Sequence, residues 1–156
     1  MTERFKVPVL KTGVLNKYRG FKSHFILTNK HDFYFYMIQL NTKLFINDNS
    51  GVKKVKCIKI TGGSFVGSLG SKITVAVHKV APNRKIKAGD VTSSLVIGLK
   101  KNLQRKDGSS LNFFRNTAIL LNSKNLPVAT RIFGPIPREL RQEKNMKVVS
   151  IAQGII

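Results

Sequence analysis

Short runs in which apolar and polar residues alternate, each ended by turn-forming residues, constrain this sequence more than any other feature. The clearest runs are VKKVKCIKI at 52–60, KITVAVHKV at 72–80 and VTSSLVIGL at 91–99. The turn sequence DNSG at 48–51 precedes the first of them. A period of two is typical of strands with one buried face. Short strands that recur in this way from Met37 onward predict a small antiparallel barrel, whose closure also removes exposed sheet edges.

The run at 52–60 indicates which of its side chains face the interior. Val52, Val55 and Ile60 occupy apolar positions of the alternation, and a further inward position falls on Cys57 or Ile58. The chain has one cysteine, which excludes an intrachain disulfide and a cysteine-based zinc cluster. Its three histidines lack metal-binding spacing. We therefore interpret the thiol as a small core residue and predict neither a metal nor a cofactor.

The net charge of the chain indicates the class of its partner. Lys and Arg number 28 against 7 Asp and Glu, which gives a formal net charge of +21. A compact protein with that charge repels itself unless a polyanion neutralises it. Nucleic acid has the required charge density, whereas binding to a membrane surface needs an amphipathic helix or an apolar anchor. The apolar run at 33–38 is far too short to span a bilayer.

The chain divides near Met37 into two parts of different composition. Residues 1–36 hold eight of the thirteen Phe and Tyr residues, interleaved with lysine and arginine, and show no sustained periodicity. This composition predicts an extended basic arm that becomes ordered only on its binding partner. Residues 37–156 are predicted to form the barrel domain.

The stretch TRIFGPIPRELR at 130–141 predicts the helical end of the domain. Gly134 can cap a helix and Pro135 suits a first helical position, so we expect a C-terminal helix from about residue 135. Ile132 and Phe133 should pack inward before it. Helical periodicity then places Ile136 and Leu140 on one face, and Arg138 and Arg141 on the opposite one. Those arginines either contact RNA or are solvated, and the charge of the chain favours RNA.

Side chains suited to catalysis are scarce in this sequence. Asp48, Asp90 and Asp107 lie in turn sequences, where aspartate accepts backbone hydrogen bonds. No carboxylates have a spacing that suggests acid–base catalysis. The segment GGSFVGSLGSK is rich in glycine but lacks the ending of a phosphate-binding P-loop. The sequence therefore predicts a protein that is not an enzyme.

Basic clusters are the main candidate binding residues. Several of them on the strands and adjoining loops of one small barrel predict a distributed phosphate-binding surface. The candidate RNA contacts are Lys53, Lys54, Lys56, Lys59, Arg84, Lys85, Lys87, Lys100, Lys101, Arg105, Lys106, Arg115, Arg131, Arg138 and Arg141.

A series of motifs resembles a known family. In chain order they are MIQLNTKLFINDNSGVKKVKCIKITGGS, KIKAGDV, KDGSSLNFFRNTAILLN, TRIFGPIPRELR and MKVVSIA. By these motifs residues 37–156 are identified as a member of the family of universal large-subunit ribosomal protein fourteen. The resemblance implies a mainly β fold, a small closed five-stranded antiparallel β-barrel with a short helical C-terminal part, to which the arm at 1–36 is added.

The resemblance also implies a function and partners. Members of the family are structural proteins that bind large-subunit rRNA near the subunit interface. They neighbour large-subunit proteins three and nineteen, meet small-subunit rRNA and contribute to an intersubunit bridge. Thr130, Arg131 and Lys147 match positions at which a ribosome silencing factor docks. Two other hypotheses remain at this stage, a free RNA-binding regulator and a membrane-associated basic protein.

The choice of amino acids suggests which ribosome is involved. Lysine outnumbers arginine by twenty to eight, and Asn, Ile, Phe and Tyr are abundant. That bias is typical of an AT-rich genome. With a basic arm ahead of a bacterial-type core, it predicts a mitochondrial ribosome first, a plastid ribosome second and the ribosome of an AT-rich bacterium third.

Overall fold

The computed structural model describes residues 38–63, 65–83, 85–141 and 145–156. The predicted arm at 1–36 and the candidate RNA contact Arg84 therefore lie outside the described residues. Within the described ranges, no helix is long and apolar enough to cross a membrane.

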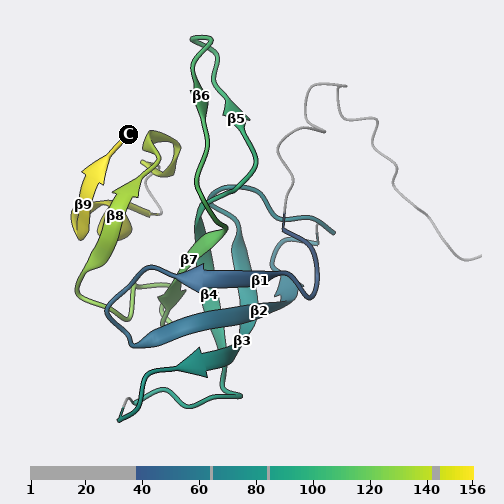
Figure 1. Ribbon diagram of the computed structural model, residues 1–156, viewed down its shortest axis with the longest axis vertical. Helices are drawn as coiled ribbons and strands as arrows, with labels where there is room; N and C mark the ends of the chain where they lie inside the picture. Colours follow the sequence, from purple (N-terminus) through teal and green to yellow (C-terminus); the bar gives the residue numbers. More distant parts are fainter. Residues whose placement is uncertain (1–37, 64, 84, 142–144) are drawn as a thin grey trace, which may run out of the picture. The chain divides into compact units, whose positions relative to one another are not determined.

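Five strands close into a barrel in the order β1-β2-β3-β4-β7 (Figure 1). They are β1 (Lys43–Ile46), β2 (Val52–Ile60), β3 (Lys72–Val80), β4 (Val91–Gly98) and β7 (Thr117–Leu121). The predicted five-stranded barrel is thus confirmed. Four neighbouring pairs are antiparallel as expected, but β1 and β7, which close the ring, are parallel. Directions cannot alternate all the way around a ring with an odd number of strands, so one parallel pair is unavoidable.

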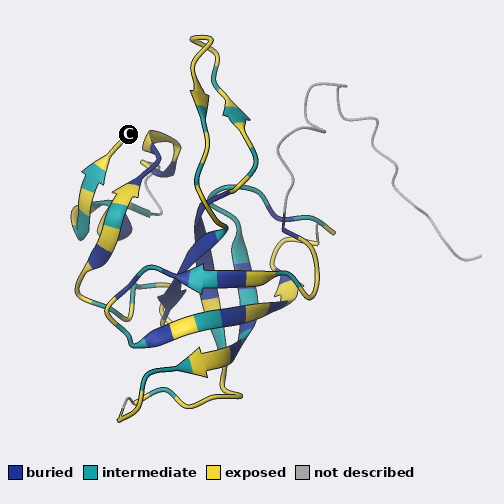
Figure 2. Ribbon diagram, in the orientation of Figure 1, coloured by how far each residue is buried: buried dark blue, intermediate teal, exposed yellow. Residues whose placement is uncertain are grey.

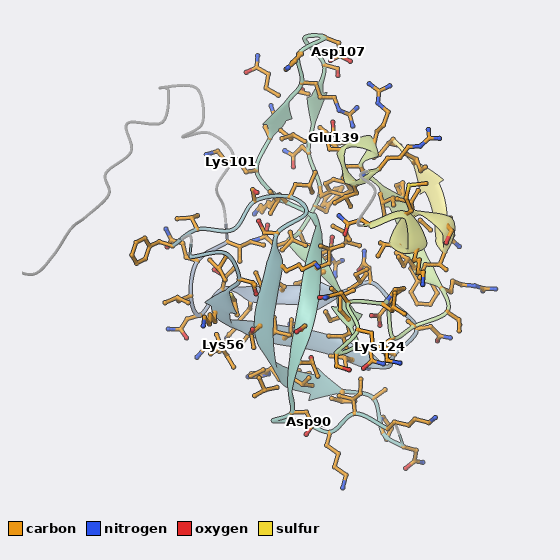
Figure 3. The ribbon with its side chains drawn as sticks, turned by 180° about the vertical axis from the view of Figure 1, so that it is seen from behind. Lys56, Asp90, Lys101, Asp107, Lys124 and Glu139 are labelled. Atoms are coloured by element: carbon orange, nitrogen blue, oxygen red, sulfur yellow. The ribbon has the colours of Figure 1, made fainter. Side chains whose placement is uncertain are left out.

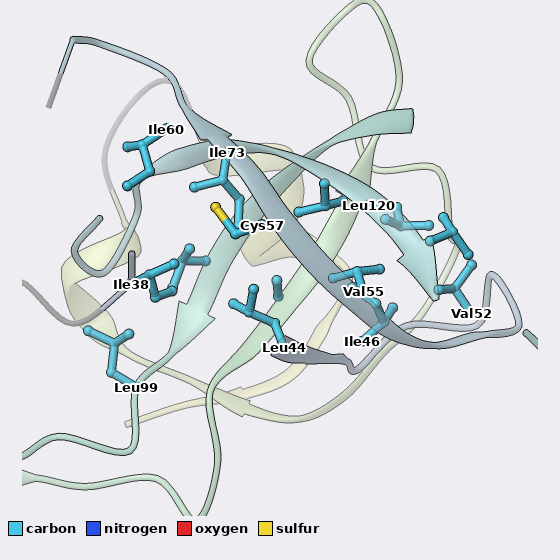
Figure 4. Packing of buried hydrophobic residues seen from close by; sticks show 14 residues of the cluster. Ile38, Leu44, Ile46, Val52, Val55, Cys57, Ile60, Ile73, Leu99 and Leu120 are labelled. Atoms are coloured by element: carbon cyan, nitrogen blue, oxygen red, sulfur yellow. The ribbon is translucent and has the colours of Figure 1, made fainter. Parts of the chain in front are cut away.

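Apolar side chains from all five strands fill the barrel interior (Figure 4). The pairing of β2 with β3 shifts register between Cys57 and Lys59. Cys57, two positions after the buried Val55, faces the core with 0% exposure, and the shift leaves Ile58 outside, where it is 46% exposed. Burial raises the pKa of the Cys57 thiol, as expected for a core side chain. Of the two residues that the sequence left as alternatives for this inward position, Cys57 and not Ile58 occupies it.

A C-terminal part packs on the outside of the barrel. It contains β8 (Ile132–Ile136), the 3₁₀ helix η2 (Arg138–Leu140), α1 (Met146–Ser150) and β9 (Ala152–Ile155). Its apolar residues form a second core with side chains of β4 and β7. All five residues of β7 are consequently buried, as are the last five of β4 (Figure 2). The C-terminal part therefore covers the outer face of β4 and β7, whose buried residues are mainly apolar on both sides of the sheet.

The C-terminal helix predicted from about residue 135 is wrong. Residues 132–136 form β8, which pairs in parallel with β9, and Pro135 lies opposite Gly154. Pro137 is still extended, with φ −66° and ψ 142°, so helical geometry begins only at Arg138 and lasts a single 3₁₀ turn. Pairing with β9, a contact between distant parts of the chain, outweighs the local glycine–proline signal for a helix start.

The two residues predicted to pack inward ahead of that helix behave differently. Ile132 is 1% exposed, as predicted, but Phe133 is 47% exposed, so its predicted burial is wrong. In an extended strand, neighbouring side chains point to opposite faces, and only one face of β8 meets the barrel. Phe133 is therefore left on the outer side.

A two-stranded hairpin leaves the barrel between β4 and β7. Its strands are β5 (Leu103–Gln104) and β6 (Ser110–Leu111), and it extends away from the barrel (Figure 1). Gly108 forms the tip with φ +82°, a conformation that glycine adopts without strain.

Candidate nucleic-acid interface

Lysines gather on the outer face of β1, β2 and β3. Because inward positions on these strands are apolar, the intervening positions direct their side chains outward. We call this surface the basic sheet face, defined by the exposed or half-buried Lys43, Lys53, Lys54, Lys56, Lys59 and Lys79. Figure 3 labels Lys56 on this face.

Strand pairing sets like charges directly opposite one another on the basic sheet face. Lys43 lies opposite Lys56 across β1 and β2, and Lys54 lies opposite Lys79 across β2 and β3. Like charges in directly opposed positions destabilise a sheet. Among the described residues, no salt bridge neutralises these lysines. The arrangement is suited to binding a polyanion, which would neutralise the repulsion.

An aromatic ring lies at the edge of this face. The Nζ atom of Lys54 is 4.8 Å from the centroid of the Phe45 ring, and the guanidinium carbon of Arg115 is 4.5 Å from the same centroid. Both distances are within the range of cation–π interactions. Phe45 therefore helps to hold two cations together near one end of β1.

The hairpin carries a second group of the candidate RNA contacts. Lys100 lies near its base and Lys106 near its tip, and both are exposed. Arg105 differs from them because its guanidinium binds within the protein: its Nη2 donates to Glu139 Oε2 at 3.1 Å and to the Ile156 carbonyl oxygen at 2.8 Å. The Arg105 guanidinium holds the pKa of the Glu139 carboxyl below its usual range. Arg105 thus joins the hairpin to the C-terminal part.

The remaining candidate contacts are spread over loops and the C-terminal part. Lys85 and Lys87 are exposed in the connection between β3 and β4, and Lys101 is half-buried near the hairpin base. Arg138 and Arg141 are exposed on either side of Leu140, which is 2% exposed. The predicted difference in burial between these arginines and Ile136 and Leu140 is therefore present, but they do not share one helix, because Ile136 belongs to β8.

The three residues matched to a silencing-factor site come from two segments. Thr130 and Arg131 directly precede β8, and Lys147 lies in α1, which leads into β9; all three are exposed. Because β8 and β9 are parallel and pair from their first residues, both segments enter this sheet at the same end.

Sequence reasoning missed part of the basic face. Lys43 and Lys79 were not among the candidates. Alternation with the buried Leu44 and Ile46 could have placed Lys43 outside, whereas Lys79 is exposed because the pairing of β2 with β3 shifts register before it. Phe45 was not among the candidates either, and Phe133 was missed as a surface group because it was expected to pack inward ahead of a helix. Within the described residues, no group of three or more His, Cys, Asp or Glu side chains comes together to hold a metal ion.

Comparison with known proteins gives a family match. A protein-family model described as "Ribosomal protein L14p/L23e" matches residues 37–156. The matched span covers well over half of the chain, including all five barrel strands, the hairpin and the C-terminal part.

Proposed function

The chain belongs to the ribosomal protein L14p/L23e family, and we propose that its basic sheet face is the main surface for large-subunit rRNA. The family makes the chain a structural, rRNA-binding constituent of the large ribosomal subunit. The observation that carries the proposal is the pairing of Lys43 with Lys56 and of Lys54 with Lys79, without an acidic partner among the described residues. Contacts of lysine with phosphate position a protein on RNA without reading its sequence.

Further basic residues extend this surface in the proposal. We propose that they are additional phosphate contacts: Lys85, Lys87, Lys100, Lys101, Lys106, Arg131, Arg138 and Arg141. Arginine is well suited to such a contact because its planar fork grips a phosphate with two hydrogen bonds. We assign Arg105 chiefly to holding the hairpin, since its guanidinium already binds Glu139 and Ile156.

The position on the ribosome is proposed from the family resemblance. We place the protein near the subunit interface, beside large-subunit proteins three and nineteen, where it meets small-subunit rRNA and contributes to an intersubunit bridge. Thr130, Arg131 and Lys147 form the proposed contact for a silencing factor; their exposure at one end of the β8–β9 sheet supports this. The lysine-rich composition supports a mitochondrial ribosome.

The salt dependence of RNA binding tests the basic sheet face. Each phosphate contact releases counterions, so log affinity should fall linearly with log salt, with a slope of about −0.7 to −0.9 per contact. Lys56→Gln should reduce the steepness of that slope by about 0.7–0.9. Lys124→Gln is the matched control, because Lys124 is an exposed lysine in a turn outside the basic sheet face and its replacement should leave the slope unchanged. The assay is fluorescence anisotropy of full-length protein with large-subunit rRNA.

Lys56→Gln should also leave the barrel intact and slightly stabilise it, because it removes the repulsion with Lys43. Equal slopes for Lys56→Gln and wild type would contradict the proposed surface. Sedimentation after a salt wash separates the ribosomal role from a free RNA-binding regulator. A ribosomal constituent stays with the large subunit, whereas a regulator leaves it.

A further inference from the structure

We propose that a hollow beside Phe45 binds one unstacked nucleotide of single-stranded RNA, with a phosphate held by Lys54 and Arg115 and the base stacked on Phe133. The proposal rests on the rRNA-binding function and names a site within it. The hollow has a volume of about 490 Å³ and is lined by residues of β1, the loop after it, β2 and β8. Sites for small molecules occupy roughly 300–1,000 Å³, so one nucleotide can be accommodated.

Strand register brings the components of this site together. Phe45 lies opposite Lys54 on β2 and opposite Thr117 on β7, and Arg115 precedes Thr117 by two residues. On the other side, the Phe133 N–H donates to the Asn47 carbonyl oxygen at 2.8 Å. Phe45, Lys54 and Phe133 therefore stand on paired strands, which hold side chains more precisely than a mobile loop does, whereas Arg115 lies in the bend before β7.

The Phe45 ring contacts two cations that both line the hollow. Lys54 Nζ and the Arg115 guanidinium lie 4.8 and 4.5 Å from the Phe45 centroid. The negative face of an aromatic ring attracts cations, so Phe45 offsets part of the repulsion between these two side chains. Two cations that line the same hollow suit the dense negative charge of a nucleotide phosphate.

Phe133, which also lines the hollow, supplies a platform for a base. Phe133 is 47% exposed although it is part of a strand, and it lines the hollow together with Asn47 and Asn49. Stacking on an aromatic side chain requires an exposed ring, and every base offers a π-face for it. Side-chain amides of asparagine carry donors and acceptors that can pair with a base edge.

The acidic residue of the lining does not oppose an anion strongly. Asp48 is buried, and its two carboxylate oxygens accept hydrogen bonds from the backbone N–H groups of Ser50 at 2.9 Å and Leu120 at 3.0 Å. Both carboxylate oxygens of Asp48 are therefore engaged by backbone N–H groups of the protein. The exposed charge around the hollow is therefore that of Lys53, Lys54 and Arg115, which favours a nucleic acid over a purely apolar partner.

Two oligonucleotide probes test the stacking part of the proposal. Full-length wild type and Phe133→Leu are titrated with a fluorescein-labelled eight-nucleotide oligouridylate and with an abasic oligonucleotide of the same length. Phe133→Leu should weaken binding of the oligouridylate by about fivefold or more, the lower end of what stacking of one base contributes. Binding of the abasic probe should not change. Phe114→Leu is the control, because Phe114 is fully exposed outside the hollow.

Binding of the abasic probe tests separately whether the Phe45 ring positions Lys54 and Arg115 for a phosphate. Phe45→Leu should weaken binding of that probe at low salt, and Phe45→Tyr should restore it, because tyrosine retains the ring that attracts both cations. A merely structural role of the ring predicts an unfolded or destabilised Phe45→Leu variant, which circular dichroism detects.

Each outcome bears on one of the two proposals. If Phe133→Leu binds the oligouridylate as wild type does, or loses both probes equally, the nucleotide site is overturned while the rRNA-binding function stands. If wild type binds neither probe at low salt, the rRNA-binding surface itself is contradicted. A loss confined to the oligouridylate, absent in the Phe114→Leu control, supports the site.

Discussion

At the scale of single residues, Arg105 shows how a side chain can change its role once its neighbours are known. In the sequence it stands in a basic cluster and is a natural candidate for phosphate binding. In the structure its guanidinium binds Glu139 and the carbonyl oxygen of Ile156, 34 and 51 residues away along the chain. The carboxylate and the guanidinium satisfy each other, and Arg105 becomes a link between the hairpin and the C-terminal part.

This link predicts a specific dependence of stability on pH. The pKa of Glu139 is lowered in the folded protein, first by its hydrogen bond to Arg105. A lowered folded pKa means that the stabilisation is complete above the unfolded value of about 4.3 and is lost as pH falls through the folded pKa. Wild type should therefore melt at a higher temperature than Glu139→Gln at pH 7, and the difference should vanish in acid.

A double-mutant cycle supplies the control for this prediction. At pH 7, Arg105→Gln should lower the melting temperature of wild type more than that of Glu139→Gln, because in the second background only the hydrogen bond to the Ile156 carbonyl oxygen remains to be lost. A melting-temperature difference between wild type and Glu139→Gln that stays constant from pH 7 to pH 3 would show that the pair does not act through ionisation.

At the scale of elements, the short turn η2 combines a buried apolar anchor with exposed basic side chains. Leu140 is 2% exposed and belongs to the second core, against the outer side of β4 and β7. A Cβ added at Gly70 would lie only 3.2 Å from Leu140 Cδ2, which shows how closely this side chain is packed. Arg138, the first residue of η2, and Arg141, the residue that follows this turn, are exposed. One short turn thus anchors the C-terminal part with its apolar residue and presents its cations to solvent.

Two substitutions in this turn should have opposite effects. Leu140→Asp buries a carboxylate without a partner and should destabilise the fold by about 3 kcal/mol or more. Arg138→Ala with Arg141→Ala should leave the fold intact and weaken rRNA binding and incorporation into large subunits. Circular dichroism and the yield of each variant in purified large subunits measure both. If the double-arginine variant assembles normally, these arginines are solvated and make no contact that matters for assembly.

At the scale of the whole molecule, the two outer faces of the barrel have different roles. The outer side of β4 and β7 is apolar and is covered by the C-terminal part, whereas that of β1, β2 and β3 carries the basic sheet face. The C-terminal part thus completes the hydrophobic core while the lysines remain accessible. Among the described residues, no salt bridge neutralises the lysines of the basic sheet face, so their charge is available for RNA.

Removal of residues 1–36 tests whether the arm serves assembly and not folding. The two cores of the described structure are built from residues 38–148, with partly buried neighbours up to residue 152, and the arm sequence lacks a periodic apolar face. The truncated protein should therefore melt at nearly the same temperature as the full chain but enter large subunits less efficiently in competition with it. A clear fall in melting temperature would instead make the arm part of the fold.

The sequence by itself determined the features that depend on local pattern. The apolar positions of the run at 52–60 predicted Val52, Val55 and Ile60 inside, as the structure has them. Strict alternation cannot bury residues an odd number of positions apart, and the register shifts between β2 and β3 allow it. The turn sequences separated the strands, and the collinear motifs indicated the family that the later comparison found.

Only the tertiary structure decided which distant segments meet. The parallel closure of β1 with β7, the pairing of β8 with β9 and the link from Arg105 to Glu139 join residues far apart in the chain. The same contacts turned the expected helix at Pro135 into a strand and left Phe133 exposed. The physical reason is that a local pattern sets the direction of a side chain, whereas the partner it reaches depends on long-range packing, which outweighs local propensity where the two conflict.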